Sequence, residues 1–163
     1  MFTDIVGSTD MTSRLGDVRS VEMVRAHDSI VRRCLKDVGG WEVKHTGDGI
    51  MASFGDMDSA VGCACSIQRE LDTFNRSNTE QLQVRIGIHA GEPIEDNNDL
   101  FGATVQTAAR ICAKAAGESV MISDVVRDDL KSDFELAELG SHPLKGISKP
   151  APLFKVVWRR AVT

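Results

Sequence analysis

The spacing of apolar residues along the chain predicts long amphipathic helices between short strands. Apolar positions recur every three to four residues over 21–38, 60–74 and about 102–115, which is the period of a helix with one buried face. Alternating apolar residues over 82–90 predict a strand. A shorter strand is expected at the start of the chain, where it ends near Asp4.

A β-hairpin is predicted between the first two helices. In the stretch EVKHTGDGIMASFGD, residues 42–56, apolar positions lie on both sides of a glycine-flanked turn at 47–49. Lys44 and Asp48 are charged residues at the ends of these strands, where burial costs desolvation free energy unless the charge is paired. The hairpin therefore carries either a salt bridge or a functional site.

The remaining segments predict a strand, a helix and two more strands, in SVMIS, DVVRDDLK, FELAEL and PLFKVVW. The order strand, helix, hairpin, helix, strand in the first part of the chain is the ferredoxin-like arrangement. We therefore expect an α+β fold, with an antiparallel sheet and helices on one face. Residues 1–163 are expected to form one domain, cut from a longer protein because the first strand begins almost at once.

Composition narrows the class of protein. The chain has 163 residues, 42% of them hydrophobic, which is enough for an ordinary core. Its net charge of −5, without a cluster of lysine and arginine, argues against nucleic acid as a partner. No apolar run approaches the roughly 20 residues of a membrane span, and no signal peptide is recognised. We expect a cytoplasmic domain, with membrane or sensor segments only in missing parts of a parent protein.

Several residues that could carry chemistry are instead expected to be structural. Cys34, Cys63, Cys65 and Cys112 lack the spacing of metal ligands and are predicted to be buried, reduced thiols.

His27 lies on the apolar face of the first long helix, where a hydrogen-bonded packing histidine is favoured over a ligand. His89 is also assigned a structural role, since no second histidine follows at metal spacing. The ending WRRAV, residues 158–162, is expected to be a solvated tail.

Asp4 and Asp48 are the first candidates for chemistry. In a ferredoxin-like topology the first strand lies beside the hairpin, so the two carboxylates can approach each other. Such a pair suits Mg²⁺ or Mn²⁺, which keep open positions for phosphate oxygens. Alternatively each aspartate caps a turn or a helix. The residues alone leave both interpretations open.

Five ordered motifs then point to a family. FTDIVGST, VKHTGDGIMASFG, VRIGIHAGEP, DLFGATVQTAARI and PLKGI, in this order and at these distances, resemble the catalytic domain of the class III nucleotidyl cyclases over essentially the whole chain. The resemblance implies the class III cyclase fold. It also implies that Asp4 and Asp48, assisted by the backbone carbonyl of Ile5, bind two Mg²⁺ or Mn²⁺ ions per site.

The resemblance also assigns residues to the nucleotide. Lys44 and Asp99 resemble the pair that reads the purine. Arg110 resembles the arginine that stabilises the phosphates in the transition state, and Arg85 and Lys145 match positions that contact the triphosphate.

The family builds its active sites across a head-to-tail dimer. The metal aspartates serve one site, while the purine pair and the arginine serve the other. The resemblance therefore implies a homodimer in which Lys44 and Asp48 face different active sites.

The purine pair indicates the substrate. Adenine offers an acceptor at N1 and a donor at N6, and guanine reverses both. Lys44 donates and Asp99 accepts, which matches adenine. The expected activity is that of an adenylate cyclase: the 3′-hydroxyl of ATP attacks the α-phosphorus, giving 3′,5′-cyclic AMP and pyrophosphate.

Gln106 departs from the family pattern, which commonly has an asparagine that orients the ribose. Its amide stands one methylene further out, and a displacement of about 1 Å can cost on the order of a hundredfold in rate. Two alternatives therefore remain. A catalytically weak or silent nucleotide-binding or dimerisation module is favoured by Gln106, and a guanylate cyclase is disfavoured by Lys44 and Asp99.

Overall fold

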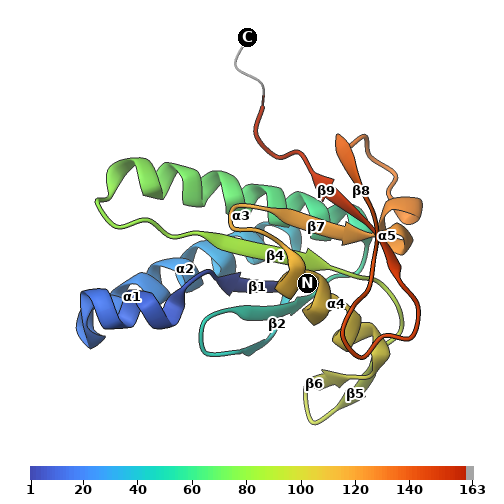
Figure 1. The fold of residues 1–163 in the computed structure, drawn as a ribbon, viewed down its shortest axis with the longest axis horizontal. Coiled ribbons are helices and arrows are strands. Elements are labelled where there is room, and N and C mark those ends of the chain that lie inside the picture. Colours follow the sequence, from blue (N-terminus) through green and yellow to red (C-terminus); the bar gives the residue numbers. More distant parts are fainter. Residues whose placement is uncertain (161–163) are drawn as a thin grey trace.

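A seven-stranded sheet runs through the computed structural model, which describes residues 1–160 (Figure 1). The strands follow one another in the order β2-β3-β1-β4-β7-β9-β8. Their bounds are β1 Phe2–Ile5, β2 Trp41–His45, β3 Ile50–Ser53, β4 Val84–Ile88, β7 Val120–Ser123, β8 Leu136–His142 and β9 Ala151–Val156. A separate two-stranded sheet contains β5 Ile94–Asp96 and β6 Asp99–Phe101.

The helices alternate with these strands, so the predicted α+β class is confirmed. They are α1 Ser8–Leu15, α2 Asp17–Val38, α3 Met57–Ser77, α4 Ala103–Lys114 and α5 Asp124–Asp129. Neighbouring strands of the large sheet are antiparallel except β4 and β7, which are parallel. The expectation of an antiparallel sheet is wrong for this pair, because α4 forms a crossover that returns the chain in the same direction.

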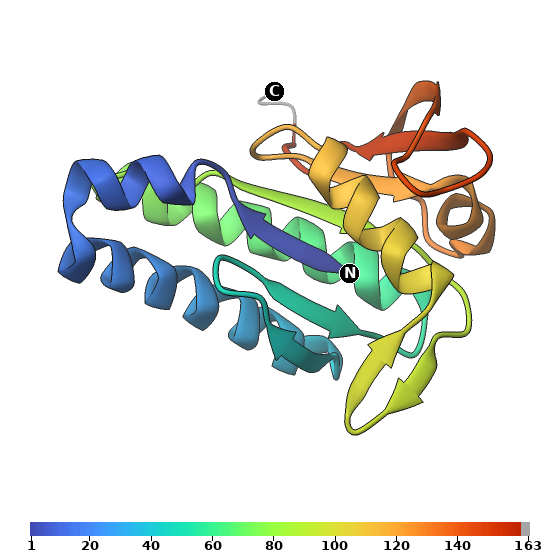
Figure 2. The ribbon, with the colours of Figure 1, turned by 60° about the horizontal axis from the view of Figure 1, so that its bottom comes forward.

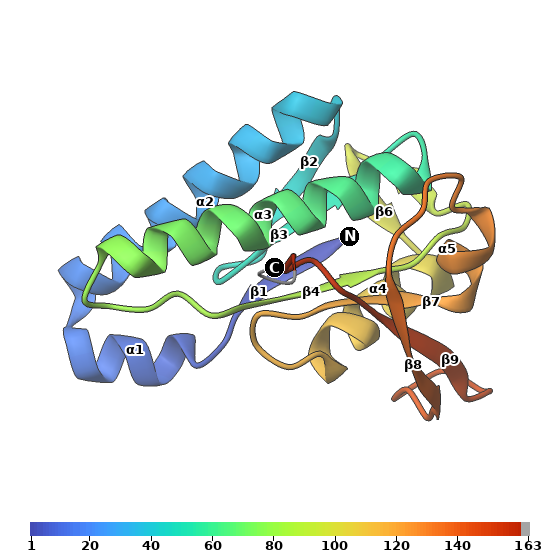
Figure 3. The same ribbon diagram turned by 90° about the horizontal axis from the view of Figure 1, so that it is seen from above.

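Helices cover both faces of the sheet. The two long helices α2 and α3 lie side by side over one face (Figure 3). The gold helix α4 crosses the opposite face (Figure 2). The prediction that the helices lie on one face therefore holds for α2 and α3 and is wrong for α4.

The alternation of β4 shows why both faces are covered. Val84, Ile86 and Ile88 point into the main core beneath α2 and α3, and each is at most 2% exposed. Gly87 faces α4, where a Cβ would lie 2.3 Å from the backbone nitrogen of Cys112. Only glycine allows the helix to approach the strand this closely.

A smaller core lies on the α4 side of the sheet. It is formed by Ile111, Ala115, Met121, Leu144 and Leu153. The four cysteines are all free and buried, as predicted. Within residues 1–160, no helix combines the length and the apolar character needed to cross a membrane.

Helix α1, the hairpin of β5 and β6, and the side chain of Trp158 also differ from the sequence predictions. Helix α1 was not predicted; it has eight residues and buries only Met11, so it lacks an apolar period. The hairpin of β5 and β6 was also missed, and its turn residues Asn97 and Asn98 have φ values of 49° and 60°.

The predicted solvated tail is wrong for Trp158. This residue is 6% exposed, and its indole N–H donates a 2.7 Å hydrogen bond to the carbonyl of Glu118. The indole therefore anchors the end of the chain to the loop before β7. Residues 161 and 162 of the predicted tail lie outside the described residues.

Candidate active site

Asp4 and Asp48 lie next to each other at the end of β1. The backbone N–H of Ile5 donates to the carbonyl of Asp48 over 2.8 Å, which joins the strand to the hairpin turn. A Cβ at Gly49 would lie only 1.8 Å from the carbonyl oxygen of Thr3. Glycine at this position therefore allows the turn to pack directly on β1, and the backbone alone brings the two carboxylates together.

The electrostatics of Asp4 reflect this arrangement. Burial raises the pKa of Asp4 above its ordinary value. Hydrogen bonds from Arg85 act in the opposite direction, and the negative charge of Asp48 adds to the increase. A carboxylate whose proton affinity is raised by a neighbouring negative charge lies in a site that favours an additional positive charge.

Arg85 provides one such charge within the chain. Its Nε and Nη2 lie 2.7 and 2.6 Å from Oδ2 of Asp4, and its Nη1 donates to the carbonyl of Ala113 over 2.8 Å. Arg85, predicted to contact the triphosphate, is therefore bound to a predicted metal ligand. To reach a phosphate it would have to leave Asp4.

Ser8 orients the second carboxylate. Its hydroxyl donates a 2.9 Å hydrogen bond to Oδ2 of Asp48 from the first turn of α1. Sequence analysis did not identify Ser8; the available signal was a serine four residues after Asp4, in the motif FTDIVGST. We call Asp4, Asp48, Arg85 and Ser8 the carboxylate cluster.

The oxygens of this cluster fit a hard divalent cation. Asp4, Asp48 and the carbonyl of Ile5 would supply oxygen ligands, which Mg²⁺ and Mn²⁺ prefer. Within residues 1–160 no group of three or more His, Cys, Asp or Glu side chains could hold a metal ion. Most remaining ligands would thus be water or phosphate oxygens, the usual pattern for Mg²⁺ bound with a nucleotide. Asp4 lies within β1 and is bound by Arg85, so it is not a helix cap.

The predicted purine pair is in contact. Nζ of Lys44, on β2, lies 2.8 Å from Oδ2 of Asp99, on β6, and 5.9 Å from the ring centre of Phe101. Lys44 lowers the pKa of Asp99 through this hydrogen bond. An exposed ion pair contributes little to stability, so both groups are available to a ligand.

Gln106 and Arg110 lie one turn apart on the exposed side of α4. Neither side chain makes a hydrogen bond or ion pair within residues 1–160. Lys145 lies in the exposed loop between β8 and β9, and the structure does not bring it into contact with the other predicted residues of the described chain. We call Lys44, Asp99, Gln106 and Arg110 the nucleotide-reading group.

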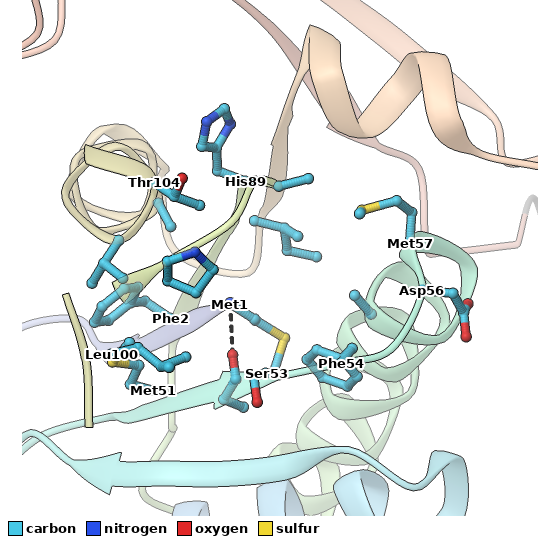
Figure 4. Close-up of a pocket in the computed structure, with 18 residues that line it drawn as sticks. Met1, Phe2, Met51, Ser53, Phe54, Asp56, Met57, His89, Leu100 and Thr104 are labelled. Carbon is cyan, nitrogen blue, oxygen red and sulfur yellow. Dashed lines mark hydrogen bonds between the residues drawn. The ribbon is translucent and has the colours of Figure 1, made fainter. Parts of the chain in front are cut away.

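A separate cavity of about 160 Å³ surrounds the other end of β1 (Figure 4). Its lining is mainly apolar and includes Phe2, Met51, Phe54 and Leu100. The N-terminal ammonium group of Met1 donates to the carbonyl of Ala52 over 2.9 Å, and burial lowers its pKa to about 6. None of the residues predicted to bind metal or nucleotide lines this cavity.

Comparisons of sequence agree with the motifs. The profile of the adenylate and guanylate cyclase catalytic domain matches residues 1–156. A putative adenylate cyclase 3 of Rhizobium meliloti is 34% identical over 115 residues, covering 68% of this chain and 20% of the relative. An adenylate cyclase of Neurospora crassa is 27% identical over 216 residues, covering 96% of this chain and 9% of the relative. The chain thus spans a fifth or less of these relatives.

Comparisons of structure give the same fold. The adenylyl cyclase CyaB from P. aeruginosa has a TM-score of 0.87 at 21% identity, covering 98% of this chain and 92% of that one. The catalytic core of a rhodopsin-guanylyl cyclase with converted specificity, in complex with ATPαS, has a TM-score of 0.83 at 26% identity, covering 97% and 93%.

Proposed function

The chain belongs to the adenylate and guanylate cyclase catalytic-domain family, and we propose that it is an adenylate cyclase, which converts ATP into 3′,5′-cyclic AMP and pyrophosphate. The main support is the contact between Lys44 and Asp99, 2.8 Å from nitrogen to oxygen. It places a donor and an acceptor side by side on an accessible surface. Such an exposed ion pair contributes little to stability.

This pair complements adenine. Lys44 would donate to N1, and Asp99 would accept from the exocyclic amine at N6. Guanine would place its N1–H opposite the lysine and its O6 opposite the carboxylate. Both contacts would then be mismatched, and mismatched polar groups in a desolvated site strongly disfavour the wrong substrate.

The carboxylate cluster would hold two Mg²⁺ or Mn²⁺ ions at Asp4, Asp48 and the carbonyl of Ile5. Divalent cations bound there would lower the pKa of the attacking 3′-hydroxyl and neutralise charge on the leaving pyrophosphate. The protein's own contribution is positioning: the turn is fixed against β1 by the close approach at Gly49, and Ser8 orients Asp48.

Arg110 would stabilise negative charge that develops on the α-phosphoryl oxygens, and Gln106 would bind the ribose. Both project from α4 without a side-chain partner within residues 1–160, so they are free to meet a ligand. Lys145 and, once released from Asp4, Arg85 would contact the triphosphate.

A homodimer would bring these groups together. No hydrogen bond or ion pair within residues 1–160 joins the carboxylate cluster to the nucleotide-reading group. Ile94 and Phe101, on the hairpin beside Lys44, are 65% and 47% exposed, which suits a surface that a second copy covers. Each active site would then combine one cluster with the partner's nucleotide-reading group.

The test is product formation by the purified chain with Mn²⁺ and either ATP or GTP. The proposal expects cyclic AMP and pyrophosphate from ATP, in equal amounts, and little cyclic GMP from GTP. Cyclic GMP as the main product would identify a guanylate cyclase. Tight ATP binding without product would identify a silent nucleotide-binding module, the alternative that Gln106 favours.

A further inference from the structure

A buried polar network connects α2 to both segments that carry the metal carboxylates. Asp28, 8% exposed, lies at its centre. Nδ1 of His27 lies 2.9 Å from Oδ1 of Asp28, and Nε2 of His45 lies 3.0 Å from the same oxygen. The His27 side chain is fully buried, whereas that of His45 is 31% exposed. One carboxylate thus joins an imidazole on the helix to an imidazole on β2.

Each imidazole also makes a second contact, next to a predicted metal ligand. Nε2 of His27 lies 3.0 Å from the hydroxyl of Thr3, the residue before Asp4. Nδ1 of His45 accepts a 3.0 Å hydrogen bond from the backbone N–H of Gly47, the residue before Asp48. The two arms of the network therefore end beside the two predicted metal ligands.

The geometry determines where the protons lie. Because the N–H of Gly47 donates to Nδ1 of His45, the proton of this ring is on Nε2 and is donated to Asp28.

The hydrogen bonds of His27 and Thr3 can be assigned in the same way. The hydroxyl oxygen of Thr3 accepts from the N–H of Ile50 over 2.9 Å. The Thr3 hydroxyl lies 3.0 Å from Nε2 of His27 and 3.5 Å from the carbonyl of Ile50, so the shorter contact favours the tautomer in which this hydroxyl donates to Nε2. In that tautomer His27 carries its proton on Nδ1 and donates it to Asp28, so one carboxylate accepts from both rings.

Asp28 is held as a carboxylate. Burial raises its pKa, but the hydrogen bonds from His27 and His45 outweigh this, and the net pKa lies below its ordinary value. Such a buried polar group is a costly way to pack a helix on a sheet, because well-packed apolar residues of similar size often give equal or greater stability. Hydrogen bonds, unlike apolar contacts, fix the relative orientation of the groups that they join.

We propose that Asp28, His27 and His45 are positioning residues that set the relative placement of the Asp4 and Asp48 carboxylates for divalent cations. The proposal rests on the metal site of the proposed function. The network restrains the backbone next to each ligand from one shared anion, so a change at Asp28 would move both ligands. Displacements of about 1 Å are enough to cost on the order of a hundredfold in rate.

The first variant to test is Asp28→Asn. Its amide oxygen can accept from one imidazole, but its NH₂ group faces the N–H of the other. The matched control is Arg32→Gln, because Arg32 also joins α2 to β2, through two 2.8 Å hydrogen bonds to Glu42, without reaching either carboxylate. Both variants are compared with wild type in Mn²⁺ binding, measured by electron paramagnetic resonance of free Mn²⁺ in the presence of an ATP analogue that cannot cyclise.

We expect Asp28→Asn to weaken Mn²⁺ binding by about tenfold, and to lower kcat more than it raises KM for ATP. Arg32→Gln should leave Mn²⁺ affinity unchanged. Equal Mn²⁺ affinity in the two variants would overturn the proposal.

A second pair of variants covers the case in which Asp28→Asn does not fold, because His45 is partly exposed and tolerates change. His45→Phe removes both hydrogen bonds of the ring and should weaken Mn²⁺ binding. His45→Gln keeps an amide N–H that can reach Asp28 and should recover part of the affinity. Wild-type Mn²⁺ affinity in His45→Phe would also overturn the proposal.

Failure of the proposed function gives a different pattern. If ATP is not cyclised but Mn²⁺ binding still depends on Asp28 and His45, the positioning role stands and only the activity is wrong. If wild-type protein binds no Mn²⁺ with nucleotide, both the metal site and the positioning role are wrong.

Discussion

The carboxylate cluster and the nucleotide-reading group differ in how completely one chain builds them. In the cluster, Asp4 is bound by Arg85, Asp48 by Ser8, and the backbones of β1 and the hairpin turn are in direct contact. In the nucleotide-reading group, Gln106 and Arg110 have no side-chain partner within residues 1–160. The first is held in place by contacts within the chain, whereas in the proposed function the second is completed by another molecule.

The difference also appears in the surroundings. The buried network of Asp28 contacts Thr3 and Gly47, the residues that precede Asp4 and Asp48 of the cluster. The nucleotide-reading group instead adjoins exposed apolar side chains on β5 and β6, notably Ile94 and Phe101. Exposed apolar residues next to functional polar ones commonly mark a surface that a partner covers. We therefore infer a division of labour: the carboxylate cluster of one chain binds the metal ions, and the nucleotide-reading group of another chain binds the nucleotide. The following substitutions test this inference, from the largest expected effect to the smallest.

Removing a metal ligand should have the largest effect. Asp48→Ala is expected to lower cyclic AMP formation by about a thousandfold or more, because the charge that would hold the cations is lost. Asp48→Asn is the matched variant, since its amide oxygen can still accept from Ser8 while the charge is absent. Circular dichroism should show an intact fold in both. Activity close to wild type in either variant would refute the metal assignment.

Arg110→Ala should lower kcat by roughly a hundredfold to a thousandfold, the usual cost of removing one group that stabilises transition-state charge. Mn²⁺ affinity should not change, because Arg110 does not contact the carboxylate cluster. Lys114→Ala, one turn later on α4, serves as the control for loss of positive charge. If both variants lose activity equally, the effect is one of general charge and not of Arg110 itself.

The purine preference should respond to the Lys44 and Asp99 pair. In the double variant Lys44→Glu, Asp99→Gly, we expect kcat/KM for ATP to fall about tenfold or more and that for GTP to increase, because the donor and acceptor pattern is no longer that of adenine. The measurement is the ratio of kcat/KM for the two nucleotides. An unchanged ratio would place purine recognition elsewhere on the chain.

Gln106→Asn should have the smallest effect. Shortening the side chain by one methylene is expected to raise kcat by up to about tenfold, since it would move the amide back to the position that the family commonly uses. Gln106→Ala should lower kcat, which separates a change of position from loss of the amide. The same kcat in all three proteins would mean that this side chain does not contact the ribose.

The sequence predicted the parts of this molecule that depend on local periodicity. The apolar stripes gave α2, α3 and α4, and the placement of a hairpin beside β1 was enough to expect Asp4 next to Asp48. Helix α1 was not predicted because it buries a single side chain. Helix α4 was predicted, but on the wrong face of the sheet. The position of α4 depends on Gly87, whose lack of a side chain matters only once Cys112 packs against it.

Long-range polar contacts were the least accessible to sequence analysis. His27 was correctly interpreted as a hydrogen-bonded packing residue, but its link through Asp28 to His45 joins residues 17 positions apart, on α2 and β2. The bond between Arg85 and Asp4 spans 81 positions. Neither follows from spacing along the chain, because tertiary packing determines which polar groups meet.

The shared active site is most directly tested by mixing two inactive variants. Asp48→Ala removes the metal half of a site and Arg110→Ala the other half, so each homodimer should be nearly inactive. In a mixed dimer one active site carries both substitutions and the other carries neither. With random pairing about half of the dimers are mixed, each with one intact site of two, so cyclic AMP production should recover to roughly a quarter of wild type. If the mixture stays as inactive as its parents, although a tag pull-down verifies subunit exchange, each site lies within one chain and the division of labour is wrong.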